Sequence, residues 1–540
     1  MGDKLRKIRY MVVFFILSYI LLDQTILIKI FDNFISNALI RNLLIYLIYI
    51  IILDIFCLFR IIRNREIIKS DFKITLILSV IFSLCVPFDA IYKTNYKNFA
   101  VPFNVIIFLS VFASLILILS NFLYLLNTKK ISKYKINSLV YFLIPFLAIS
   151  IKWIKNFPAL MSFDSYYQLE QIQNNTFNDV HPAAHTLFCK ALLQIYNSPA
   201  TIVFFQILFL SLGIWYIFRV FNKLGVSNKV MIGILTIWSC ITTLQTTTCY
   251  LWKDVFYSIS LLFVTVVLMK SLLLKEKIKI VDCIILALGL SGTVLFRHNG
   301  IVPFILIVIS IIYLIYKFKD KLYSISIIVS LIIIIFTKTI VYDFYEVKPN
   351  DNGTKYAIFA KAVVSVVAND GNYNEEELEI IEEIMPIEAI KRNYNWSQGQ
   401  DLLWNIDKED SEYGFANTLV NKEEILLKIF FKLLPKNFFL MAYDVIGSAA
   451  IMWQIDFIRL NLFSIHMVYC IPIILCGLLL IRKRKYKKLI PFIPCVGNIL
   501  SIVISNISAE ARYGYPTLVL MCTLIIYSYI EINTEERGLC

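Results

Sequence analysis

Residues 299–340, NGIVPFILIVISIIYLIYKFKDKLYSISIIVSLIIIIFTKTI, decide the class of protein to which this chain belongs. Two apolar runs of about 20 residues, the length at which a helix crosses a bilayer, flank a short basic segment. Similar runs recur along most of the 540 residues, of which 59% are hydrophobic and 17% are charged. A soluble domain is about 45–50% apolar and about 25% charged. The sequence therefore excludes a soluble globule and predicts an all-α polytopic membrane protein.

The apolar runs predict about 14 membrane spans. They centre on residues 10–30, 39–59, 74–92, 102–126, 137–155, 199–221, 229–249, 255–272, 279–296, 299–317, 322–340, 460–481, 489–507 and 513–531. We expect four parts, which are an accessory four-helix bundle (1–130), a membrane core (131–340) with a first outer loop (156–198), a long extracytoplasmic loop (341–459) and a C-terminal three-helix segment (460–540). In the long loop, the spacing of apolar residues over 375–388 predicts an amphipathic helix, and the stretch 425–453 is expected in the outer interface.

The distribution of charge predicts the orientation of the chain. Lysine and arginine number 52 against 38 acidic residues, a net charge of +14. The cations gather in alternate short connections, such as 129–135, 270–279 and 482–488, and connections of this kind face the cytoplasm. The basic composition is thus a topology signal and not a nucleic-acid footprint. We expect a multi-pass protein of the plasma membrane, with both termini cytoplasmic and with no nucleic-acid partner.

The connections on the opposite side carry an unusual set of polar residues. The first outer loop holds Asp164, Tyr167, Gln168, Asp179, His181 and His185, and the later outer junctions hold Lys253, Asp254, Arg297, His298, Asn299, Glu510, Arg512 and Tyr513. Ionisable groups at membrane depth are costly and usually mark a site. We therefore expect these segments to converge on one site at the outer membrane boundary.

The residue types in this set favour chemistry on a phosphate. Guanidinium groups and lysine match phosphate oxygens, which makes Lys253, Arg297 and Arg512 candidates for holding one. Asp164 is then a candidate general base, since a carboxylate within hydrogen-bond reach of a hydroxyl takes its proton. Neither glycine-rich motif of the nucleotide-binding enzymes occurs in the sequence. An activated group is therefore expected to arrive attached to a lipid.

These segments resemble motifs of the GT-C superfamily of membrane glycosyltransferases, in particular the protein O-mannosyltransferase and aminoarabinose transferase side, as a bacterial branch. The motifs are Asp164 in the first outer loop, Asp179 to Pro182, Lys253-Asp254 and Glu510 to Tyr513. The resemblance covers residues 137–531 and implies a GT-C-like core. It also implies inverting transfer of a sugar from a polyprenyl-phosphate carrier to an acceptor, which is a cell-envelope glycan, a lipid or a protein.

The resemblance assigns roles to individual residues. Asp164 is the implied base, and the three cations named above are the implied phosphate ligands. That branch commonly has two adjacent acids in the first loop, whereas Ser165 follows Asp164 here. Asp179 is the candidate for the second acid, and His181 is a further catalytic candidate. The supporting candidates are Tyr167, Gln168, Asp254, His298, Asn299, Glu510 and Tyr513.

Structural interpretations of the two acids stay open at this point. Asp164 is also suited to cap a helix that begins at Ser165, because aspartate is a preferred cap residue. The segment 179–182 is also typical of a helix start, with proline in the first turn.

A metal site and a different function also stay open. His181, His185 and Cys189 recur every four residues, a spacing that suits zinc ligands. No cofactor is required by the motifs, but a divalent metal is a further hypothesis. The rival function is a transporter or flippase of a lipid-linked saccharide. Such proteins tend to have broken helices near the midplane, whereas most spans predicted here are uninterrupted.

Overall fold

The computed structural model describes residues 136–349, 356–394, 422–451, 466–505 and 511–533, with scattered positions between 54 and 126. Within these ranges the chain is helical, and two isolated bridges are the only strand-like pairings. The expectation of an all-α protein is confirmed for the described part. The predicted accessory bundle, 1–130, lies almost wholly outside the described residues, as does Glu510.

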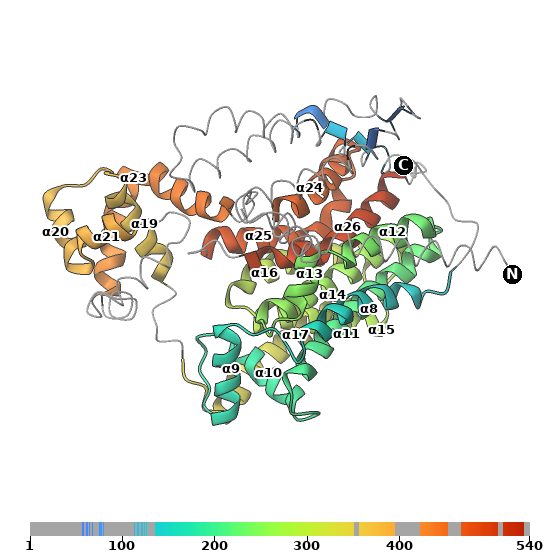
Figure 1. Cartoon of the computed structure of the whole chain (residues 1–540), viewed down its shortest axis with the longest axis horizontal. Helices are drawn as coiled ribbons and strands as arrows, with labels where there is room; N and C mark the ends of the chain where they lie inside the picture. Colours follow the sequence, from blue (N-terminus) through green and yellow to red (C-terminus); the bar gives the residue numbers. More distant parts are fainter. Residues whose placement is uncertain are drawn as a thin grey trace, which may run out of the picture.

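The described helices fall into three stretches of the chain (Figure 1). The first contains α8 (Val140–Lys155), α9 (Phe163–Asn174), α10 (Ala183–Leu193), α11 (Pro199–Lys223), α12 (Asn228–Ser239), α13 (Thr242–Thr248), α14 (Lys253–Leu274), α15 (Ile280–Leu295), η1 (His298–Gly300), α16 (Ile301–Phe318), α17 (Lys321–Phe336), η2 (Thr337–Val341) and α18 (Tyr342–Phe344). The second contains α19 (Ala357–Ala368), α20 (Glu375–Ile384), α21 (Ile387–Asn393) and α23 (Glu423–Ile451). The third contains α24 (His466–Arg482), η5 (Tyr486–Phe492), α25 (Ile493–Ser505), η6 (Ala511–Gly514) and α26 (Tyr515–Asn533).

Six helical segments among the described residues are long and apolar enough to cross a membrane. They are Pro199–Lys223, Lys253–Leu274, His298–Phe318, Lys321–Phe344, Tyr486–Ser505 and Arg512–Asn533. The bent pair α12 and α13 makes a seventh if it is one span. Two other predicted spans are shorter helices, because α8 and α15 have 16 residues each, and a third, 460–481, is described only from His466 onward, as α24. The structure thus supports six or seven of the 14 predicted spans.

The predicted span 229–249 is not a continuous helix. The axes of α12 and α13 meet at an angle of 62° at Cys240 and Ile241. The Gln245 side chain donates to the carbonyl of Ser239 at 3.0 Å and to that of Ala148 at 3.2 Å. A side-chain amide therefore satisfies a carbonyl that the break frees, as buried backbone at membrane depth requires.

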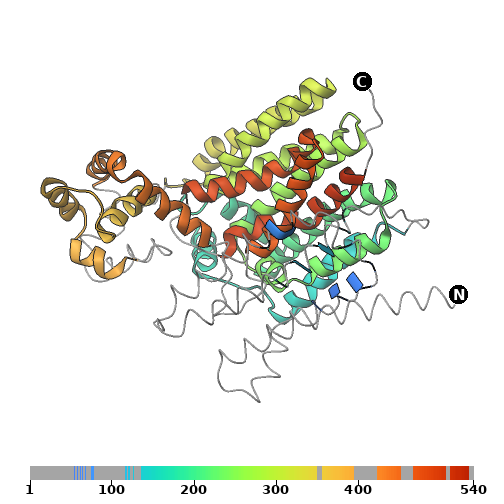
Figure 2. The ribbon, with the colours of Figure 1, turned by 90° about the horizontal axis from the view of Figure 1, so that it is seen from above.

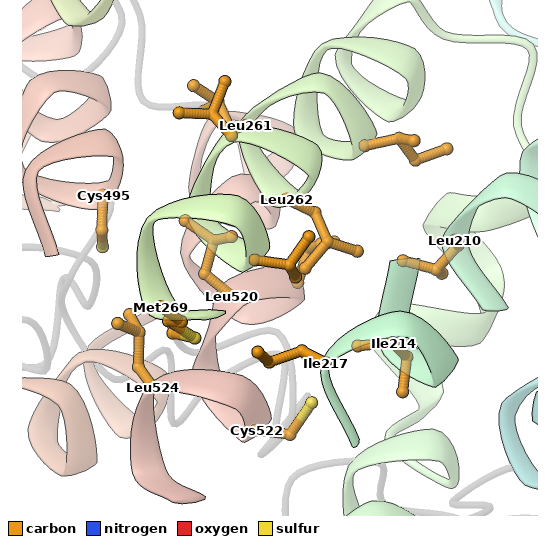
Figure 3. Close-up of a cluster of buried hydrophobic side chains, with 14 of the residues drawn as sticks. Leu210, Ile214, Ile217, Leu261, Leu262, Met269, Cys495, Leu520, Cys522 and Leu524 are labelled. Carbon is orange, nitrogen blue, oxygen red and sulfur yellow. The ribbon is translucent and has the colours of Figure 1, made fainter. Parts of the chain in front are cut away.

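The core of the bundle lies where α11, α14 and α26 pack together (Figure 3). The apolar windows of α14 and α26 are 78% and 94% buried, whereas that of α17 is 11% buried. The close-up shows Leu210, Ile214, Ile217, Leu262, Met269, Leu520, Cys522 and Leu524 among the side chains that fill the space around the three helices. Since α14 is enclosed along most of its length, its first residues have a fixed position, and this matters for the site described below.

A second, smaller core lies between α19, α20, α21 and α23. These helices are set apart at one end of the molecule in both views (Figures 1 and 2). The amphipathic helix predicted over 375–388 is confirmed in its first part, since α20 buries Ile381 and Ile384. The helix α20 ends at Ile384, and a separate helix, α21, begins at Ile387 after Pro386. The kinked helix α23 covers most of 425–453 and is not among the segments apolar enough to span a membrane.

Candidate functional site

The site forms where the start of α9 meets the start of α14. Backbone hydrogen bonds tie the two segments, because Leu160 N donates to the Cys249 carbonyl at 2.9 Å and Leu251 N donates to the Leu160 carbonyl at 3.3 Å. The Trp252 indole N–H donates to Ser162 Oγ at 2.7 Å. Two segments about 90 residues apart in sequence are thereby held side by side. Asp164 follows Ser162 in one segment, and Lys253 follows Trp252 in the other, so the two residues lie close to each other.

Asp164 lies in the first turn of α9, which begins at Phe163 and has Ser162 as its N-cap. The Ser162 backbone N–H donates to Ser165 Oγ at 3.2 Å, so serines make the local contact at this helix start. The alternative that Asp164 caps a helix beginning at Ser165 is therefore wrong. The Asp164 carboxylate instead meets Arg512, whose Nη1 lies 2.5 Å from Oδ2.

Two further predicted residues, Lys253 and His181, extend the contact between Asp164 and Arg512 to a row of four side chains. The Lys253 ammonium, at the start of α14, donates to His181 Nδ1 at 2.6 Å. Since an ammonium only donates, Nδ1 is the acceptor and Nε2 carries the proton of the neutral imidazole. Nε2 lies 3.6 Å from Asp164 Oδ1. Lys253, His181, Asp164 and Arg512 thus follow one another in space, from four separate segments.

The charges in this row set the protonation of its members. Burial alone would raise the pKa of Asp164, but the charges of Arg512 and Lys253, together with the hydrogen bond from Arg512, lower it below the ordinary value. Burial, followed by the nearby Lys253 charge, lowers the pKa of His181 to about 4. At neutral pH the row therefore holds an ionised carboxylate and an uncharged imidazole.

A buried ion pair lies beside this row. Arg297 Nη1 is 2.8 Å from Asp254 Oδ1, and both side chains are almost fully enclosed. Neither oxygen of Asp254 has a hydrogen bond of good geometry among the described residues, so charge is the main attraction in this pair. The Tyr513 ring lies between the two arginines, with its centroid 4.7 Å from the Arg297 guanidinium and 5.5 Å from that of Arg512.

We name these six ionisable residues the charged cluster: Asp164, His181, Lys253, Asp254, Arg297 and Arg512. With His181 neutral, three cations face two carboxylates, which leaves one positive charge in a largely enclosed place. The start of α14 adds to this, because its N-cap residue, Trp252, makes no side-chain cap hydrogen bond. A helix start carries a partial positive charge, which favours an anion. The arrangement is suited to binding a negatively charged group.

The structure places other predicted residues around the cluster. The Tyr167 ring meets the His181 ring edge-on, with centroids 6.0 Å apart. Gln168 Oε1 lies 2.8 Å from Nδ1 of the fully buried His185. Asn299 donates to Ser505 Oγ at 2.9 Å, on the side of α25. These residues pack the surroundings of the cluster, whereas Glu510 lies outside the described part of the chain.

Asp179 is held at a different place from Asp164. Its Oδ1 accepts hydrogen bonds from Ala183 N at 2.8 Å and from the Tyr342 hydroxyl at 3.0 Å. The Asp179 backbone carbonyl lies 2.9 Å from His298 Nε2. The carboxylate therefore stabilises the first turn of α10, which is the helix-start interpretation left open by the sequence.

The described residues offer no cluster of three or more His, Cys, Asp or Glu side chains arranged to hold a metal ion. His185 contacts Cys189, whose Sγ lies 3.7 Å from Nε2, but its other nitrogen faces Gln168. Of the three residues whose spacing suggested zinc, His185 and Cys189 are in contact. His181 instead accepts a hydrogen bond from Lys253.

One residue of the site was not predicted. Trp252 binds Ser162, stacks on Tyr250 with ring centroids 4.0 Å apart, and lies under the Arg512 guanidinium at 5.4 Å. Its position directly before Lys253 was a usable signal. Tryptophans at membrane boundaries are common enough, however, that an interfacial anchor was the simpler interpretation.

Comparison with known proteins gives no relative for this site: no protein-family model, no curated protein and no solved structure matches the chain.

Proposed function

We propose that the chain is an integral-membrane glycosyltransferase that moves a sugar from a polyprenyl-phosphate carrier to an acceptor on the extracytoplasmic side. The observation that carries the proposal is the row of Asp164, His181 and Lys253 ending at Arg512, which puts a carboxylate among phosphate-binding cations. The order of motifs that resembles the GT-C superfamily supports the same function. The apolar helices, which could span a membrane, supply a surface for a lipid-linked donor.

In the proposed reaction the carboxylate of Asp164 is the general base. The acceptor hydroxyl attacks the anomeric carbon of the donor sugar, the bond from that carbon to the phosphate oxygen breaks, and Asp164 takes the hydroxyl proton. Polyprenyl phosphate leaves with the bonding electrons, and its added charge is stabilised by Arg512, Lys253 and Arg297. His181 orients the row through Nε2, and Asp179 has a positioning role at the start of α10.

The outer location in this proposal rests on the two ends of α14. The charged cluster contains its first residues, whereas Lys270 lies one turn before its other end, and Lys275, Lys277 and Lys279 follow that end. A helix of 22 residues is about 33 Å long, close to the thickness of a bilayer core. Basic connections face the cytoplasm, so the opposite end of α14 faces outward.

The substitution Asp164→Asn tests the function. It keeps the size of the side chain and removes the base, so transfer from a labelled polyprenyl-phosphate sugar in membranes should fall by about 100- to 10,000-fold. The matched control is Glu276→Gln, a carboxylate-to-amide change at an exposed position beyond the other end of α14, which should keep full transfer. Equal turnover in Asp164→Asn and the unsubstituted protein, at equal protein levels, would falsify the assignment.

The break between α12 and α13 favours a second candidate, a flippase of lipid-linked saccharides. Discontinuous helices line the substrate path in many transporters. Here the polar side chain at the break, Gln245, bonds to carbonyls within the protein. In reconstituted vesicles, protein-dependent movement of a labelled lipid-linked saccharide without cleavage of its sugar bond would favour this second candidate.

A further inference from the structure

A cavity of about 450 Å³ lies beside the charged cluster. The second half of α9, the loop after it, and the segment 345–348 that follows α18 form its walls. This volume lies within the range of small-molecule sites in proteins. Tyr167 belongs to both places, since it lines the cavity and its ring meets that of His181.

The walls of the cavity are rich in side-chain amides and aromatic rings. Gln171, Asn174 and Asn178 line it, together with the ring of Tyr345. An amide supplies both donors and an acceptor, which suits a ligand whose hydroxyl groups also do both. Gln171 is buried, and its Nε2 has no hydrogen-bond partner among the described groups, while Oε1 accepts from Asn178 N at 3.0 Å. Asn174, which is exposed at the end of α9, is the lining amide that a ligand hydroxyl can reach.

The charges of the cavity differ from those of the cluster. Glu170, Glu346 and Lys348 line it, and the Lys190 ammonium lies against three more of its lining residues, Asn175, Phe177 and Tyr345, so two carboxylates are balanced by two cations. The cavity therefore lacks the surplus of positive charge that favours a phosphate at the cluster, and it suits an uncharged ligand better. The two neighbouring places fit the two different parts of a transfer reaction, a charged donor and an uncharged acceptor.

The backbone at the cavity is less suited to an extended peptide. Lys348 N donates to the Phe177 carbonyl and Asp179 N donates to the Lys348 carbonyl, both at 2.9 Å. These groups form the isolated bridge between Asn178 and Lys348, so they are not available to pair with an added strand. A ligand of the cavity is therefore recognised by side chains and not by backbone hydrogen bonds, which favours a saccharide over a peptide bound by strand addition.

We infer that this cavity binds a neutral, hydroxyl-rich saccharide, which is the acceptor if the transfer proposed above is correct. The distance between the cavity and Asp164 fits that role. Asp164 and Gln171 are seven residues apart on α9, a rise of about 10 Å along the helix axis. A saccharide seated in the cavity and extending past Tyr167 toward the start of α9 brings its terminal hydroxyl toward the base.

The experiment measures saccharide binding directly, so that it does not depend on transfer. The purified full-length protein in detergent is titrated with a panel of neutral oligosaccharides of hexose, N-acetylhexosamine and pentose units, and binding is followed by saturation-transfer NMR. The test variant is Asn174→Trp, which fills the cavity from an exposed position at the end of α9. The matched control is Gln173→Trp, the same change at the neighbouring exposed residue, which does not line the cavity.

Binding of a panel member that weakens at least tenfold in Asn174→Trp and stays unchanged in Gln173→Trp supports the inference. The inference is overturned if no panel member binds, if Asn174→Trp binds as well as the control, or if short neutral peptides bind there and saccharides do not. Each of these results leaves the proposed transfer to be judged by Asp164→Asn alone.

Discussion

The substitution His181→Gln should make the stability of the protein less sensitive to acid. His181 is neutral in the folded chain, because burial and the Lys253 charge lower its pKa to about 4 from an ordinary value of 6.5. Since the unfolded chain binds this proton first, stability is complete above about pH 6.5 and falls as the pH drops toward 4. Glutamine has no proton to take up in this range, and its carbonyl oxygen can still accept from Lys253.

The size of the effect follows from the two pKa values. Between pH 7.5 and pH 4.5, a group with a pKa of 6.5 when unfolded and about 4 when folded contributes a loss of about 2.5 kcal/mol. His181 has 17% of its side chain exposed, so solvent screening reduces this value only slightly. His185, whose pKa burial lowers to about 3, gives a similar loss in both proteins and cancels from the comparison.

The assay is denaturation of the detergent-solubilised protein at the two pH values, with the free energy of unfolding compared between variants. The control is Tyr167→Phe, which changes the ring that meets His181 but adds no group that titrates in this range. It should shift stability equally at both pH values. If His181→Gln loses as much stability on acidification as the unsubstituted protein does, the account of a neutral, buried His181 is wrong.

Substitutions at two contacts, the ion pair of Arg297 with Asp254 and the hydrogen bond of Trp252 with Ser162, test how the cluster is supported. Arg297→Gln should cost about 3–5 kcal/mol of stability, because it leaves the buried carboxylate of Asp254 without its partner. The double variant Arg297→Gln/Asp254→Asn should cost less, because it removes that carboxylate as well. A double-mutant cycle, with unfolding by denaturant, measures the difference. Trp252→Phe should cost about 0.5–1.5 kcal/mol by removing the hydrogen bond to Ser162. Ser162→Ala should cost a similar amount, and additive losses in the double variant would contradict this reading of the contact.

The fold was predictable from sequence as far as local pattern determines it. A run of 20 apolar residues has few alternatives to a membrane helix, so α11, α14, α16, α17 and α26 lie where they were expected. The break between α12 and α13 was not predicted, because hydropathy averages over a window and does not record that Gln245 bonds to the carbonyls of Ser239 and Ala148. Hydropathy also gives no sharp helix ends, and this explains why α8 and α15 are shorter than the expected spans.

The site was predictable as a set of residues but not as a set of contacts. Topology placed Asp164, Lys253 and Arg512 at one boundary, and the structure brings their side chains into one row with His181. Nothing in the sequence indicated that Arg297 pairs with Asp254, one residue from Lys253. On a helix, neighbouring residues face different directions, so the Lys253-Asp254 pair splits between two partners. Only the packing of α14 against its neighbours decides which partner each one meets.

The contact between Asp164 and Arg512 gives the proposed reaction an order. While Arg512 lies 2.5 Å from the carboxylate, its charge lowers the pKa of Asp164 and makes it a weaker base. A donor phosphate near the start of α14 competes for the same guanidinium, because phosphate oxygens and carboxylate oxygens suit the same planar fork. Binding of the donor would therefore draw Arg512 away and restore basicity to Asp164 at the moment when a leaving group is present. An acceptor hydroxyl that arrives first meets a carboxylate already engaged by arginine. The ion pair between Asp164 and Arg512 thus links activation of the base to binding of the donor.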